Sequence, residues 1–274
     1  MADRELAQGW FHVRELEPGV HAIEEPLHAE NVASFLIQGE DRALLVDAGT
    51  GVGDFAAVVA GLTNLPVTLL VSHSHWDHVG CADQFALDCP VLVHPLEAER
   101  LRAGVSNERM REFFAPDQLH GPLPEGTDLE SLVISGVEPT GMIEDGDQID
   151  LGGRLLQIVH VPGHSPGLLA LLDRESGMLI TTDAIYGGAL YAHLPGVDFP
   201  AYQKSAARLG ALEPMIRNVY ASHNDRRLDP SILGRVVRAF ADIADGREPD
   251  AIESDVARHE FDGFSVLRPA EEYP

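Results

Sequence analysis

Four side chains of the types that bind transition metals lie within one short segment of the chain. They are His73, His75, Asp77 and His78, in the sequence VSHSHWDHVG. Neutral imidazole and carboxylate groups both bind Zn²⁺, but a catalytic zinc usually has three protein ligands and keeps one position for water. The segment holds too many ligands for one open site. Its spacing therefore indicates two metal ions that share one turn.

Three further candidate ligands follow in similar contexts. His164 lies in PGHSPG, Asp183 in ITTDAIY and His223 in YASHND, and each comes after an apolar, strand-like run and before a turn or helix. Ligands from distant parts of a chain converge in loops at the ends of strands. One such residue alone is more often a capping or surface group. Three of them, in this order, predict the remaining ligands of a two-metal site.

The apolar and glycine patterns predict elements that place these residues at strand ends. We expect strands at 35–38, 42–46, 66–71, 91–93, 148–149, 155–161, 168–172, 178–181 and 218–221, and helices at 53–62, 79–87, 95–103, 201–212 and 230–244. Residues 104–140 break this rhythm with scattered prolines and glycines, which predicts an irregular insertion or lid. We predict a single domain that spans residues 1–274.

The motif HxHxDH, followed by a loop histidine, an aspartate after a strand and a final loop histidine, resembles the metallo-β-lactamase superfamily. The resemblance implies an α/β fold, the four-layer αββα sandwich, with metal ions at one end of the two sheets. It also implies one ligand set for each ion and one shared carboxylate. The first ion would be bound by His73, His75 and His164, the second by Asp77, His78 and His223, and Asp183 would bridge the two.

The same resemblance implies roles for residues beside the ligands. Asp47, in LLVDAGTG, resembles a strand-end aspartate that orients a ligand histidine. Tyr186 follows Asp183 by three residues, where lactonases and some acyl-CoA thioesterases of the superfamily place a tyrosine. Its phenol would donate a hydrogen bond to the substrate oxyanion. The substrate pocket would be lined by His28 and Asn31 in PLHAENVAS and by Tyr191 and His193 in YGGALYAHLPG.

The implied reaction is hydrolysis of a thioester, ester or lactone. Two divalent ions, with Zn²⁺ expected and Fe or Mn as alternatives, would share a hydroxide that attacks the carbonyl carbon. Asp77 would take the proton of this hydroxide and deliver it to the leaving group. The segment TTDAIYGGALYAHLP resembles acyl-CoA thioesterases and, less closely, lactonases. For a CoA substrate, the candidates for binding the phosphates are Arg100, Arg102, Arg109 and Arg111.

Two other activities stay open for this ligand pattern. Glyoxalase II uses the same ligands and recognises glutathione through basic residues toward the C-terminus, for which Arg226 and Arg227 are candidates. Persulfide dioxygenases resemble the same scaffold, but they bind one iron and carry out an oxidation. The β-lactamases of the superfamily use a cysteine at the bridging position, so Asp183 disfavours antibiotic hydrolysis.

Charge and composition narrow the range of partners. The chain has 44 acidic and 19 basic residues and a formal net charge of −25, so its field repels nucleic acid. Its apolar runs are shorter than the roughly 20 residues of a membrane-spanning helix, and the N-terminal residues lack the apolar stretch of a secretory signal. Cys81 and Cys89 make a poor disulfide framework, which fits a reducing cytoplasm. We expect a cytoplasmic enzyme with a small-molecule acyl substrate and no nucleic-acid or membrane partner, and a homodimer stays open.

Overall fold

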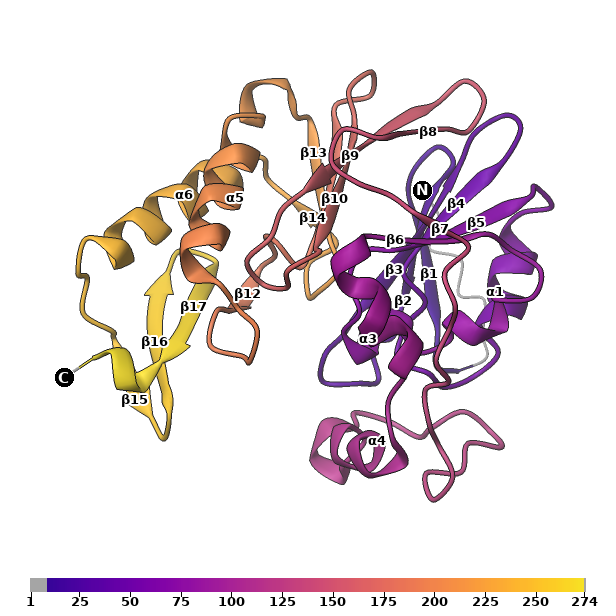
Figure 1. The fold of residues 1–274 in the computed structure, drawn as a ribbon, viewed down its shortest axis with the longest axis horizontal. Helices are drawn as coiled ribbons and strands as arrows, with labels where there is room; N and C mark the ends of the chain where they lie inside the picture. Colours follow the sequence, from indigo (N-terminus) through magenta and orange to yellow (C-terminus); the bar gives the residue numbers. More distant parts are fainter. Residues whose placement is uncertain (1–8, 274) are drawn as a thin grey trace. The chain divides into compact units, whose positions relative to one another are not determined.

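The computed structural model describes residues 9–273, which form two compact units (Figure 1). The first unit comprises residues 9–144 and Gln148–Leu155, and the second comprises Asp145–Asp147 and residues 156–273. Each unit has its own sheet and its own helices. The single domain that the sequence predicts stays a prediction.

The first unit is built on a seven-stranded sheet whose strands follow one another in chain order. Neighbouring strands are antiparallel from the first strand to the fourth and parallel from the fourth strand to the seventh. The strands are β1 (His12–Glu17), β2 (Val20–Glu24), β3 (Ala33–Gln38), β4 (Ala43–Val46), β5 (Val67–Val71), β6 (Val91–Val93) and β7 (Gly141–Met142). Strand β4 is buried throughout and entirely apolar, as expected for a strand covered on both faces. Because β4 and β5 are parallel neighbours, the loops that follow them lie at the same edge of the sheet.

Two helices of the first unit begin at side chains that cap their free N–H groups. Asp54 accepts a hydrogen bond from Ala57 N at the start of α1 (Phe55–Leu62), and Ser106 accepts one from Arg109 N at the start of α4 (Asn107–Phe113). Between them lie α2 (Trp76–Val79) and α3 (Ala98–Ala103), the latter preceded by the 3₁₀ turn Pro95–Glu97. The predicted helices at 53–62 and 95–103 are therefore confirmed in outline.

The helix predicted at 79–87 is wrong. Helix α2 ends at Val79, and only the 3₁₀ turn Ala82–Gln84 follows. The backbone of this stretch bonds to the loop after β4 instead of continuing a helix, because Gly80 N donates to Gly49 O and Cys81 N donates to Ala48 O. A Cβ atom on Gly80 would lie 2.1 Å from Gly51 N, so only glycine permits this approach.

The segment 104–140, predicted as an irregular insertion or lid, consists of α4, the 3₁₀ turn Pro116–Gln118 and loops. The segment folds back on itself, because the amide of Asn107 donates to the carbonyl oxygens of Leu129 and Leu132, each at 2.8 Å. Val105 and Ile134 also form an isolated bridge. That this segment is an insertion or lid stays a prediction. The short strand β8 (Gln148–Asp150) follows it in the first unit.

The second unit contains a sheet in which strands run in the order β14-β13-β11-β10-β9. The bounds are β9 (Leu155–His160), β10 (Leu169–Asp173), β11 (Met178–Thr182), β13 (Asn218–Ala221) and β14 (Arg227–Leu228). Strands β9, β10 and β11 are antiparallel neighbours, and β11 and β13 are parallel. Helices α5 (Phe199–Gly210) and α6 (Ser231–Ala244) lie side by side (Figure 1). Tyr202 of α5 packs edge-on against Phe240 of α6.

A smaller sheet near the C-terminus was not anticipated from the sequence. Its order is β12-β17-β16-β15, with β12 (Gly188–Tyr191), β15 (Ala251–Glu253), β16 (Val256–Phe261) and β17 (Phe264–Pro269). Strand β12 lies in a glycine-rich segment that carries no local strand signal. It forms because it pairs in parallel with β17, which lies far along the chain. Among residues 9–273, no helix is long and apolar enough to cross a membrane.

Candidate metal centre

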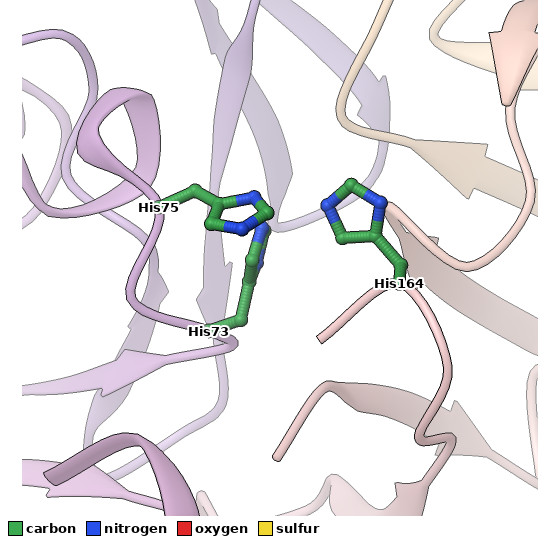
Figure 2. Close-up of side chains that lie close together, drawn as sticks. All are labelled: His73, His75 and His164. Atoms are coloured by element: carbon green, nitrogen blue, oxygen red, sulfur yellow. The ribbon is translucent and has the colours of Figure 1, made fainter. Parts of the chain in front are cut away.

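The first group of candidate ligands lies just after β5, in the first unit. The rings of His73 and His75 are 4.5 Å apart between centroids, and those of His73 and His78 are 4.2 Å apart. Figure 2 shows the rings of His73 and His75 next to each other on the segment that follows the strand. His73 and His78 are fully buried. One short turn therefore gathers three imidazole rings in a protected environment.

Asp47, which follows β4, connects this turn to the neighbouring strand. Its Oδ1 atom accepts a hydrogen bond from Ser72 N at 2.7 Å, and its Oδ2 atom accepts one from Ser72 Oγ at 2.7 Å. The Nδ1 atom of His78 lies 2.8 Å from Asp47 Oδ2, which favours a proton on Nδ1 and leaves Nε2 as the donor atom. This Nε2 atom lies 3.6 Å from Asp77 Oδ2. A carboxylate that orients a histidine in this way is typical of metal sites.

The same turn is held by contacts of three residues that the sequence analysis did not single out: Glu97, Trp76 and Phe113. Glu97, buried at the start of α3, accepts hydrogen bonds from Ser74 N at 3.0 Å and from the Ser74 hydroxyl. Trp76, between His75 and Asp77, stacks on Phe113 of α4 with centroids 4.4 Å apart and an angle of 8°. Nothing in the local sequence marks Glu97 or Phe113, because each acts through a contact with a distant segment.

His28 and Asn31, predicted to line the substrate pocket, lie in the loop between β2 and β3. His28 is 1 % exposed, and both of its ring nitrogens are engaged: Nε2 lies 3.0 Å from Phe113 O, and Nδ1 accepts from Glu30 N. Burial lowers the pKa of His28, which favours the neutral ring that this pattern requires. Asn31 adopts a positive φ of 42° and donates its N–H to His28 O. These contacts stabilise the loop, and a contact with substrate stays a prediction.

The second group of candidate ligands belongs to the second unit. His164 follows β9, Asp183 follows β11 and His223 follows β13, three strands that run in the same direction. The Oδ2 atom of Asp183 lies 3.1 Å from His223 Nε2 and 3.5 Å from His164 Nε2. All three residues are buried, and Figure 2 labels His164 on its loop. One carboxylate oxygen thus lies close to two imidazole nitrogens from separate loops.

The predicted oxyanion donor, Tyr186, lies beside this group. Its ring centroid is 5.2 Å from that of His223, and its hydroxyl donates a hydrogen bond to Ala189 O. A phenol has a single proton, so Tyr186 can donate to a substrate only when this internal hydrogen bond opens.

Tyr191 and His193, the other predicted pocket residues of the second unit, have ring centroids 5.6 Å apart. His193 lines a cavity of about 350 Å³ together with Phe199 and Arg268. Burial lowers the pKa of His193. The cavity could accept a small ligand, and its use by substrate stays a prediction.

The arginines considered for phosphate or glutathione recognition are largely engaged within the fold. Arg102 forms two hydrogen bonds with Glu138, and Arg109 and Arg111 pair with Glu112 and Glu130. Near His223, Arg226 is buried and donates to Ser222 O, whereas Arg227 donates to Asn218 Oδ1. Acidic partners therefore offset most of the local positive charge in the segment of α3 and α4.

The donor chemistry of both ligand groups fits divalent transition metals. Imidazole nitrogens and carboxylate oxygens are the usual ligands of Zn²⁺. Within each unit, an imidazole nitrogen and a carboxylate oxygen lie within 3.6 Å of each other. Side chains able to hold a metal ion are His73, His75, Asp77, His78, His164, Asp183 and His223.

Comparisons with known proteins agree with these observations. Residues 29–223 match the family model of the metallo-beta-lactamase superfamily. The acyl-coenzyme A thioesterase MBLAC2 of Gallus gallus is 31 % identical over 211 residues, which cover 73 % of this chain and 75 % of that protein. The human protein of the same name is 29 % identical over 238 residues, 82 % of this chain and 80 % of that protein.

A solved metallo-beta-lactamase from Pontibacter korlensis aligns with a TM-score of 0.63 and 16 % identity, over 84 % of this chain and 99 % of its own. At such a low identity, the alignment is evidence of the fold alone. This structural similarity confirms the α/β metallo-β-lactamase fold predicted from the sequence. The match to the family model covers most of the chain and includes all seven candidate ligands. The chain therefore belongs to the metallo-beta-lactamase superfamily.

Proposed function

We propose that this protein is a dinuclear metal-dependent hydrolase that cleaves a thioester, with an acyl-CoA as the preferred class of substrate. The observation that carries the proposal is the position of Asp183 Oδ2, 3.1 Å from His223 Nε2 and 3.5 Å from His164 Nε2. In the proposed centre this carboxylate would be shared by two ions, one bound by each of these histidines. The similarity to an acyl-coenzyme A thioesterase supports the substrate class.

The proposed ligands come from both units. His73, His75 and His164 would bind one ion, Asp77, His78 and His223 would bind the other, and Asp183 would bridge them. The order of these residues along the chain and the close spacing within each group support this assignment. We propose Zn²⁺ as the ion, because imidazole and carboxylate donors of this kind are its usual ligands.

The bound ions would supply Lewis acidity and lower the pKa of a bound water to about 7. The protein residues then have distinct tasks. Asp47 accepts the Nδ1 proton of His78 and so keeps Nε2 as the ligand atom. The carboxylate of Asp77 would take up a proton and pass it to the leaving thiol. Tyr186 would stabilise the substrate oxyanion after its hydroxyl leaves Ala189 O.

The experiment that tests the proposal is a panel of substrates offered to zinc-loaded protein. The panel contains an acyl-CoA, S-lactoylglutathione, an acyl-homoserine lactone and nitrocefin, and metal content is measured on the same samples. We expect two zinc ions per chain and the highest kcat/KM with the acyl-CoA. A preference for S-lactoylglutathione would show that the substrate is a glutathione thioester and not an acyl-CoA, while thioester hydrolysis would remain the reaction. One iron per chain with oxygen uptake in the presence of a persulfide would overturn the hydrolase.

A further inference from the structure

Tyr202 lies on α5 in the second unit and is fully buried. Its ring packs edge-on against Phe240 of α6, with centroids 4.9 Å apart and an angle of 85°. The ring position is therefore set by the packing of two helices, and the hydroxyl at its far end cannot move independently of α5.

The hydroxyl of Tyr202 points at the backbone of the loop that carries Asp183. It donates to Ala184 O at 2.8 Å and shares the same proton with Asp183 O at 3.0 Å. Burial raises the pKa of Tyr202 well above its usual value, so the phenol keeps its proton and remains a donor. The backbone of the proposed bridging ligand is thereby tied to a rigid helix.

The same part of α5 also contacts the loop that carries His164. Gly163 approaches so closely that a Cβ atom on it would lie 2.2 Å from Tyr202 Cβ and 2.3 Å from Tyr202 Cα. Ser205 Oγ donates to Pro162 O at 2.6 Å, and Asp198 N donates to Gly163 O at 3.0 Å. A single helix therefore holds two ligand loops that lie 19 residues apart in the sequence.

We propose that Tyr202 is a positioning residue that fixes the loops of Asp183 and His164 relative to each other. The inference deepens the proposed function and rests on it. Metal ligands must stay within about 0.5 Å of their working geometry, and they do so only when a second layer of contacts holds them. Tyr202 contributes to that layer at both loops. Its hydroxyl donates to the loop of Asp183, and its backbone and Cβ pack against the loop of His164.

The test compares Tyr202→Phe with a matched control in the same unit. Tyr202→Phe removes only the hydroxyl and retains the ring that packs against Phe240. Tyr273→Phe removes a hydroxyl that pairs with His259 Nε2 at 2.7 Å, away from the proposed ligand loops. Three quantities are measured: thermal stability of the metal-free proteins, zinc affinity by competition with a chelator, and the visible absorption spectrum of the Co²⁺-loaded proteins.

We expect both metal-free variants to melt slightly below the wild type. Only Tyr202→Phe should bind zinc more weakly, by about 10- to 100-fold, the range found when outer partners of metal ligands are lost. Its Co²⁺ spectrum should also differ from that of the wild type, because the ligand geometry changes. Wild-type affinity and an unchanged Co²⁺ spectrum in Tyr202→Phe would overturn the positioning role and leave the proposed function intact. A wild-type protein that binds neither metal would overturn both.

Discussion

The two groups of candidate ligands are held by different chemistry. In the first unit, buried carboxylates accept hydrogen bonds from the ligand turn and from the loop after β4: Asp47 from Ser72 and His78, Glu97 from Ser74, and Glu25 from Thr50. In the second unit, hydroxyl groups donate to backbone carbonyls: Tyr202 to Asp183 and Ala184, Ser205 to Pro162, and Thr181 to Ile185. Carboxylates titrate and hydroxyls do not in the ordinary pH range. The first unit should therefore respond to pH through Glu25, whose pKa is raised by burial, and the second ligand group should respond to the loss of individual hydroxyls.

Spacing along the chain explains this difference. The ligands of the first unit lie within six residues, so one turn and a few strong acceptors suffice to hold them. Those of the second unit lie on three separate loops, and the backbone polar groups of each loop need hydrogen-bond partners of their own. Hydrogen bonds from hydroxyls to backbone carbonyls do this without adding charge next to the proposed bridging carboxylate.

The largest expected effect is at the carboxylate within the second ligand group. Asp183→Ala should remove the shared ligand and lower both metal content and kcat/KM by more than about 100-fold, beyond the cost of losing an outer partner. Metal analysis and kinetics on the same preparation measure this. Asp229→Ala, which removes an exposed carboxylate that accepts a hydrogen bond from Ser231 N, is the matched control. Two metals retained in Asp183→Ala would show that this residue does not bridge.

Asp47→Asn tests the carboxylate that supports the first ligand group. The amide places N–H groups where Ser72 and His78 now donate, so His78 loses its orientation. We expect metal affinity to fall by about 10- to 100-fold, measured by chelator competition. Asp54→Asn, at the exposed cap of α1, should leave the affinity unchanged. Equal affinities in both variants would mean that Asp47 stabilises only the turn.

Glu25 makes the pH response of the first unit measurable. Burial raises its pKa from 4.5 to about 7, and it accepts hydrogen bonds from Trp10 and Thr50. An acid with a raised pKa binds more protons in the folded state, so its contribution is fully present below pH 4.5 and is lost as the pH rises to about 7. Across this window the free energy of unfolding should fall by about 3 kcal/mol from this group.

Glu25→Gln should flatten the dependence of unfolding free energy on pH across that window, as measured by urea denaturation at a series of pH values. The amide keeps a neutral group of the same shape that does not titrate. Glu175→Gln, on an exposed turn of the second unit, serves as the control and should leave the slope unchanged. A slope in Glu25→Gln equal to that of the wild type would remove the proposed contrast between the two units.

The smallest effect is expected at Tyr186. Its hydroxyl donates to Ala189 O, so during catalysis it would exchange this hydrogen bond for one to the substrate. The gain is limited to the net free energy of that exchange. Tyr186→Phe should lower kcat by about fivefold, equivalent to roughly 1 kcal/mol, with metal content unchanged. An unchanged kcat would exclude Tyr186 from the reaction, and a loss of metal would instead give it a structural role beside His223.

The sequence by itself predicts the features that depend on neighbouring residues. The apolar runs in β4, β5, β10 and β11 specify buried strands, because a strand covered on both faces is mostly apolar; of the four, β4 is apolar at every position. The HxHxDH motif and the family to which it leads are equally local, since six consecutive residues carry the ligands. The α/β fold follows from both.

Only the tertiary structure decided the features that depend on distant partners. Helix α2 stops at Val79 because the loop after β4 takes up the backbone of Gly80 and Cys81. Strand β12 exists because β17 pairs with it, and Glu97, Phe113 and Tyr202 contact ligand loops far from them in sequence. Such contacts leave no local pattern, because the free energy that selects them comes from packing and hydrogen bonds formed only when remote segments meet.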